Sequence, residues 1–215
     1  MQYQKFSSNS LASGALACFG YASLGLLLMH VLRADYQPAS HMISDYAVGE
    51  FGWVMVTVFV AWSGGIALLL SALLVAEPSS LARRLGALLL GITSIGLLVS
   101  ASYPTDLPGF PDTHEGNVHT LSFLVNIVSM LVAIPLLSFS FGQKSGLRSF
   151  RPVALALALA VVLAFLLQFF TLRKGMSYGL TNRLFVIVLL SWLICTAARL
   201  RRLPLNAHCG ARLNA

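Results

Sequence analysis

The stretch FGWVMVTVFVAWSGGIALLLSALLVA, residues 51–76, contains no charged side chain. A helix of about 20 apolar residues crosses the ~30 Å hydrocarbon core of a bilayer, and this stretch is long enough to tilt or to extend into the interface. Similar apolar stretches occupy residues 11–32, 85–103, 119–142, 152–172 and 184–199. The sequence therefore predicts six membrane-spanning helices.

The composition also indicates a membrane protein. Hydrophobic residues make up 57% of the 215 residues and charged residues only 10%, whereas a soluble domain carries roughly 25% charged residues. Short connections favour antiparallel neighbouring helices. We therefore predict an all-α polytopic transmembrane bundle of six helices. Its predicted parts are a cytoplasmic N-terminus at 1–10, the transmembrane domain at 11–200, and a flexible basic cytoplasmic tail at 201–215.

The positive charge is divided unevenly between the two sides of this predicted bundle. Ten of the 14 lysines and arginines lie in the N-terminus, the second and fourth connections and the tail, and four lie in the first and fifth connections. Positively charged connections tend to stay in the cytoplasm. We therefore expect both termini in the cytoplasm and the first, third and fifth connections outside. The net charge of +7 is then a topology signal, and no nucleic-acid partner is expected.

The predicted outer side collects most of the acids and histidines. Negative charge outside complements positive charge inside, but a neutral imidazole does not direct topology, so the histidines need another explanation. The pattern fits either a solvated set of loops or the mouth of a site. The residues concerned are Asp35, Asp45, Glu50, Asp106, Asp112 and Glu115, with His30, His41, His114 and His119.

A polar stripe follows the start of the fourth apolar stretch. His119, Ser122, Asn126 and Ser129 are spaced i, i+3, i+7 and i+10, so they share one face of a helix. An asparagine in hydrocarbon is costly unless it is paired or hydrated. The stripe is therefore either a set of interhelical hydrogen bonds or the wall of an outward-open cavity. Gln168 is a candidate partner of Asn126 or a second wall of the same cavity.

Metal binding and catalysis have weaker support. His114 and His119 are five residues apart, which separates them by about 140° on a helix, and no metal-like cysteine spacing occurs; neither a metal nor a cofactor is predicted. His119 is the candidate base, with Asp45 or Asp106 to orient it. Candidate hydroxyls are Ser44, Ser100 and Ser102. No nucleophile-elbow motif joins them, so an enzyme is permitted but not indicated.

The fifth connection departs from the charge rule. Arg173, Lys174 and Arg183 lie on the predicted outer side. They either pair with the outer acids or bind an anionic head group, for which arginine is well suited. Both alternatives can hold together, because a balanced pocket suits a zwitterionic lipid head.

Several short motifs carry a resemblance to a known family. HMISDYAVGEFGW (41–53), YPTD (103–106), THEGNVH (113–119) and GLTNRLF (179–185) resemble the domain of unknown function 998 family of prokaryotic six-pass membrane proteins, over about residues 15–200. The motif positions that carry over are Ile43, Ser44, Asp45, Pro104, Thr105, Asp106, Gly116, His119, Gly179 and Arg183. Members often have a histidine directly before the glycine, where this chain has Glu115. The resemblance implies a bacterial inner-membrane, multi-pass protein and supplies no reaction.

The combined expectation is an integral membrane protein whose outward-facing polar pocket binds or helps to handle a lipid or other amphiphile. One alternative is a membrane-embedded enzyme that acts on lipid head groups, with His119, Asp106 and Asp45 as catalytic candidates. Another is an accessory subunit of a larger membrane complex. Membrane lipids are the expected partners, and protein partners are possible. The predicted ligand-binding residues are Ser44, Asp45, Asp106, Glu115, His119, Asn126, Arg173 and Arg183.

Overall fold

The structure is a computed structural model that describes residues 7–76, 80–142, 145–173 and 176–203. These residues form six long α-helices and two short 3-10 helices, with no strand among them. The elements are α1 (Ser8–Leu32), η1 (Ile43–Ala47), α2 (Gly52–Ala76), α3 (Leu81–Ser102), α4 (His114–Ser140), η2 (Arg148–Phe150), α5 (Arg151–Arg173) and α6 (Tyr178–Arg201). The predicted tail lies outside the described residues from residue 204 on.

Capping explains where the helices begin. The side chain of Ser7 accepts a hydrogen bond from Ser10 N before α1, and that of Ser80 accepts from Arg83 N before α3. Thr113 accepts from Gly116 N before α4. Each cap satisfies a backbone N–H that would otherwise lack a partner in the first turn. These three capped helices therefore start three to five residues before the apolar stretches that predict them, most clearly α4, which starts at residue 114 and not at 119.

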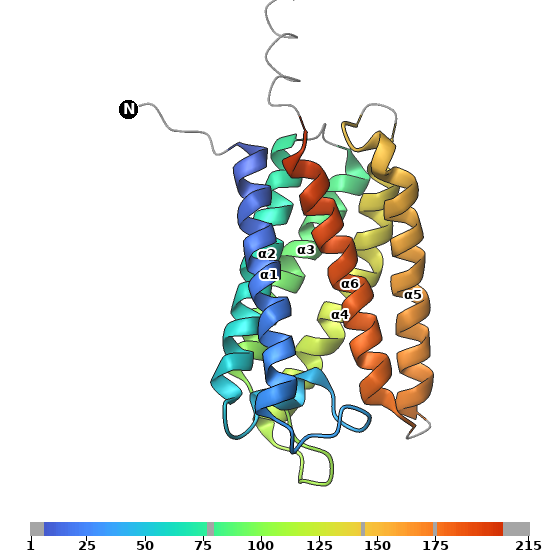
Figure 1. The fold of residues 1–215 in the computed structure, drawn as a ribbon. Coiled ribbons are helices and arrows are strands. Elements are labelled where there is room, and N and C mark those ends of the chain that lie inside the picture. The colour runs from blue at the N-terminus through green and yellow to red at the C-terminus, as the bar shows by residue number, and fades with distance from the viewer. Residues whose placement is uncertain (1–6, 77–79, 143–144, 174–175, 204–215) are drawn as a thin grey trace, which may run out of the picture.

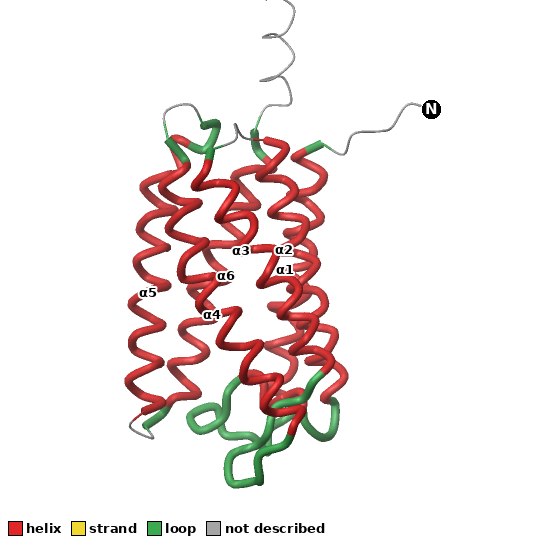
Figure 2. Tube along the Cα trace, turned by 180° about the vertical axis from the view of Figure 1, so that it is seen from behind, coloured by secondary structure: helices red, strands yellow, loops and turns green. Residues whose placement is uncertain are grey.

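The six helices stand side by side as a closed ring in sequential order, and α6 packs back against α1 (Figure 1). The start of α1 and the end of α6 lie at the same end of the bundle. The connections 33–51 and 103–113 lie together at the opposite end, as the view from behind also shows (Figure 2). We call this opposite end the loop end.

α1 and α2 pack closely where two glycines leave room for neighbouring side chains. A Cβ on Gly65 would lie 2.6 Å from the ring of Phe19, and one on Gly25 would lie 2.4 Å from a methyl of Val58. Close approach at small residues is how helices pack in a bilayer, where the lipid is as apolar as the protein surface.

The outward surface of the ring is apolar. Leu24 is 69% exposed, Ile95 66% and Leu163 56%, which suits contact with lipid and not with water. All six helices are long and apolar enough to cross a membrane. The prediction of an all-helical, six-span membrane protein is confirmed, while the side on which each end lies stays a prediction from charge.

Candidate functional site at the loop end

Two arginines hold the first connection in place, one directly after α1 and one in α6. Arg33 directly follows α1 and is only 6% exposed. It forms a salt bridge with Asp35 at 2.9 Å and donates to the carbonyl oxygens of Val48 and Glu50. The hydrogen bond with Asp35 raises the pKa of Arg33 and lowers the pKa of Asp35. Arg33 thus ties the two ends of the 33–51 connection together.

Arg183, in the second turn of α6, binds the same connection from the other side. Its Nη1 donates to Pro38 O at 2.9 Å and His41 O at 2.7 Å, and its Nη2 donates to Tyr46 Oη at 2.9 Å. Its Nε donates to His30 Nε2 at 2.8 Å. Within the described residues no carboxylate lies within salt-bridge distance of Arg183. The hypothesis that Arg183 pairs with an outer acid is therefore wrong, because its hydrogen bonds go to loop carbonyls, a histidine and a tyrosine hydroxyl.

The glycine of the same motif lets the connection approach. Gly179 N donates to Ala39 O at 3.0 Å. A Cβ on Gly179 would lie 2.3 Å from Pro38 O and 2.4 Å from His41 O. Asn182, one turn further, accepts from Ile43 N at 3.1 Å. The motif GLTNR therefore serves as a backbone clamp on residues 38–43.

Asp106 joins the third connection to the start of α4. Its two carboxylate oxygens accept from Thr113 N at 2.9 Å and from Thr113 Oγ1 at 2.8 Å. A Cβ on Gly116 would overlap this carboxylate, at 1.9 Å from Oδ2. A negative charge at a helix N-terminus is favourable because the helix dipole is positive there. Asp106 thus has a structural role, whatever else it does.

Asp45 is buried within η1, at 4% exposure. Its Oδ2 accepts from Met42 N at 3.0 Å. Burial raises the pKa of Asp45 to about 6, although the bond from Met42 and the charges of His41 and Arg183 act in the opposite direction. The charged form costs free energy here because no salt-bridge partner compensates for the lost hydration.

Asp45 and Asp106 line one pocket at the loop end, which we call the outer pocket. Its volume is about 320 Å³, and its polar lining comes from both long connections and from α4 and α6. No lysine or arginine is among its described lining residues. The lining includes Asp45, Asp106, Asp112, Asn117, Thr120 and Tyr178. The structure thus brings together two predicted site residues that are 61 positions apart in the sequence.

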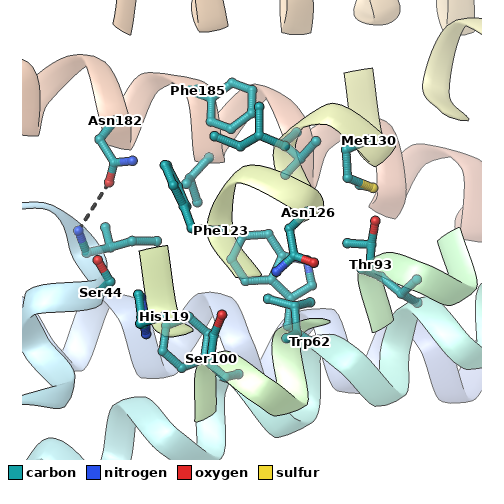
Figure 3. Close-up of a pocket in the computed structure, with 17 residues that line it drawn as sticks. Ser44, Trp62, Thr93, Ser100, His119, Phe123, Asn126, Met130, Asn182 and Phe185 are labelled. Atoms are coloured by element: carbon teal, nitrogen blue, oxygen red, sulfur yellow. Dashed lines mark hydrogen bonds between the residues drawn. The ribbon is translucent and has the colours of Figure 1, made fainter. Parts of the chain in front are cut away.

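A second, smaller cavity of about 80 Å³ lies inside the bundle, which we call the inner cavity (Figure 3). Its walls come from α2, α3, α4, α6 and η1. Most of the lining is apolar. Three of the polar exceptions are predicted site residues: Ser44, His119 and Asn126. The other polar groups come from Thr93, Ser100, Asn182 and the indole of Trp62.

The polar stripe of α4 serves both purposes that the sequence left open. His119 and Asn126 line the inner cavity. Ser122 instead donates to Gly96 O at 2.7 Å and lies 3.2 Å from Ser100 Oγ, so it joins α4 to α3. Ser129 is buried as well. One face of the helix therefore supplies both interhelical hydrogen bonds and a cavity wall.

Three groups at or near this face have unusual hydrogen bonding. His119 Nδ1 donates to Tyr103 O at 2.8 Å, so the neutral ring keeps Nε2 as its acceptor. Trp62 Nε1 and Asn126 Oδ1 are buried and have no hydrogen-bond partner among the residues that the structure describes. Gln168 Oε1 is also without one and Gln168 does not line the cavity, so the predicted pairing of Gln168 with Asn126 is wrong. The sequence does not mark Trp62 as a cavity residue, because it lies within the apolar stretch 51–76.

The outer pocket and the inner cavity adjoin at the segment 42–45, which includes the start of η1. Met42 and Asp45 line the outer pocket, whereas Ile43 and Ser44, between them in the chain, line the inner cavity. The backbone N–H of Asp45 donates to Met42 O at 3.2 Å, within the same turn. Residues 42–45 therefore border both spaces, as do neighbouring residues of α4, where Thr120 lines the outer pocket and His119 the inner cavity.

Two further predicted residues, Glu115 and Arg173, are not among the described lining of either space. Glu115 is exposed on the first turn of α4 and lines neither. Arg173 ends α5, and its side chain lies outside the described residues. In the part of the chain that the structure describes, no group of three or more His, Cys, Asp or Glu side chains is placed to hold a metal ion.

Comparison with known proteins gives one informative result. Neither the curated proteins nor the solved structures contain a match to the chain. A family model described as "Protein of unknown function (DUF998)" matches residues 15–199. Since this match covers most of the chain, the protein is a member of the DUF998 family.

Proposed function

We propose that the protein binds an amphiphile at the loop end, with the polar head in the outer pocket and the apolar part in the inner cavity. In this proposal the loop end faces the outside of a bacterial cytoplasmic membrane, as the charge distribution predicts. The observation that carries the proposal is that a polar pocket adjoins a largely apolar cavity, with residues of η1 lining both. That arrangement matches the two halves of an amphiphile.

The lining indicates the chemistry of the head. Three aspartates and no described cation line the outer pocket, so a head with a positive charge or with several N–H or O–H donors is favoured over an anionic one. The inner cavity offers apolar contact from residues such as Phe59, Ile66 and Leu97. Its 80 Å³ holds only about two or three waters. Binding a chain therefore requires η1 to move.

The geometry supports binding better than catalysis. A general base needs a nucleophile or water within hydrogen-bond reach and a group that orients it. His119 is oriented by the Tyr103 carbonyl and not by a carboxylate. Asp45 and Asp106 accept from the backbone of their own connections. The three catalytic candidates thus do not form a hydrogen-bonded set.

Binding of dodecylammonium, measured by native mass spectrometry on detergent-purified protein, tests the proposal. Thr93→Leu adds bulk inside the inner cavity and is expected to abolish the adduct. Ser71→Leu is the matched control, because both hydroxyls donate to the carbonyl four residues earlier and only Thr93 lines the cavity. Equal adduct formation in the two variants would contradict the proposal. Purification only together with other subunits would favour the accessory-subunit alternative.

A further inference from the structure

A groove of about 410 Å³ lies between α1 and α6, on the surface that faces lipid. Leu27 and Ile187, which line it, are 66% and 61% exposed. We infer that this groove binds one acyl chain of an anionic lipid whose head group contacts Arg183. The site is separate from the outer pocket and does not depend on the function proposed above.

The length of the groove matches half a bilayer. Along α6 its lining runs from Arg183 to Ile194. Eleven residues of helix at 1.5 Å each span about 16 Å, and one leaflet contributes about half of the ~30 Å hydrocarbon core. The apolar walls between these ends include Leu26, Leu190 and Val186. An acyl chain from the leaflet at the loop end therefore fits along the whole groove.

The charge at the end of the groove selects the head group. Arg183 has five N–H donors. Nε–H donates to His30, the two Nη1–H groups serve the carbonyls of Pro38, His41 and Gly179, and one Nη2–H donates to Tyr46. One Nη2–H remains. A phosphate oxygen is the natural acceptor for it, because arginine binds phosphate with charge and hydrogen bonds together.

The described neighbours of Arg183 do not neutralise its positive charge. His30 Nδ1 lies 2.7 Å from Leu26 O, to which it must donate, and His30 Nε2 accepts from Arg183. This histidine is therefore neutral and adds no charge. Asp45 interacts electrostatically with Arg183, but its carboxylate accepts a hydrogen bond from Met42 N and forms no salt bridge with Arg183. The end of the groove thus carries one positive charge, and no described carboxylate is in contact with it.

Spin-labelled lipids provide the test, with full-length protein reconstituted in phosphatidylcholine vesicles. The measured quantity is the motionally restricted fraction of spin-labelled phosphatidylglycerol, compared with that of spin-labelled phosphatidylcholine. We expect at least about a fivefold preference for phosphatidylglycerol, which corresponds to about 1 kcal/mol. Equal association of the two lipids with the wild-type protein would overturn the inference.

Three variants locate the preference. Ser191→Trp fills the groove, and the Ser191 hydroxyl bonds only to the carbonyl of Ile187 in its own helix; this variant is expected to lose the preference. Leu163→Trp on α5 places the same indole on a lipid-facing position outside the groove and should keep it. Arg183→Gln should equalise the two lipids. Because that variant also weakens the loop clamp and can fail to fold, retention of the preference in Ser191→Trp is by itself enough to refute the inference.

Discussion

Replacing Gly179 with alanine tests the clamp between α6 and the first connection. The new Cβ would lie 2.3 Å from Pro38 O, whereas an ordinary contact begins at 3.4 Å. The connection must therefore retreat by about 1 Å, which stretches the bonds from Arg183 to Pro38 O and His41 O. Overpacking of this kind typically costs about 1–3 kcal/mol. For a chain of this size, a loss of about 2 kcal/mol lowers the unfolding temperature by roughly 4–8 °C.

Thermal unfolding of the detergent-purified variants measures this effect. Gly91→Ala is the matched control, because a Cβ at that position in α3 meets no heavy atom within 4 Å. Alanine is a better helix former than glycine by about 1 kcal/mol, so Gly91→Ala should leave the unfolding temperature unchanged or raise it. If Gly179→Ala unfolds at or above the wild-type temperature, the close approach of the connection to α6 is refuted.

Three further outcomes are expected from thermal unfolding. Asp106→Asn should lower the free energy of unfolding by about 1–2 kcal/mol, because an amide offers only one acceptor oxygen to the two donors of Thr113; a Thr113→Val background should reduce that loss. Trp62→Phe removes an indole N–H without a partner and should be neutral or stabilising, whereas Trp192→Phe removes a 3.0 Å bond to Ser138 and should destabilise. The pKa of Asp45 is raised to about 6, from 3.8, so the folded state binds more protons between these values and stability should fall, on the order of 1–3 kcal/mol, as pH rises from about 4 to about 6. Above that range the contribution is constant, and Asp45→Asn should remove this part of the pH dependence; an unchanged profile in Asp45→Asn would show that another group titrates.

The motif residues show where prediction from sequence ends. Asp106, Arg183 and Gly179 stand out in the sequence because they are polar or small at the ends of apolar stretches. The structure places each of them in a contact that shapes a connection: Asp106 with Thr113, Arg183 with loop carbonyls, and Gly179 under Pro38. Spacing along the chain cannot separate a residue that binds a ligand from one that binds a backbone carbonyl, since both need the same donors and acceptors.

The sequence by itself determined that this protein lies in a membrane and that it consists of six spanning helices. Runs of about 20 apolar residues have one stable solution in a bilayer, the helix, because every backbone hydrogen bond must be satisfied within the segment. Local caps such as Thr113 then decide where each helix begins. These are effects of neighbours in the chain, so they can be read from it.

Only the tertiary structure decided which residues surround a common space. Asp45 and Asp106 share the outer pocket, His119 and Asn126 share the inner cavity with Trp62, and Arg183 closes a groove between the first and last helices. Helix rotation and the path of the first connection determine these groupings. Both depend on packing between segments that are distant in sequence, such as the contact of Gly179 with residues 38–41, and this information is not contained in the spacing of any one motif.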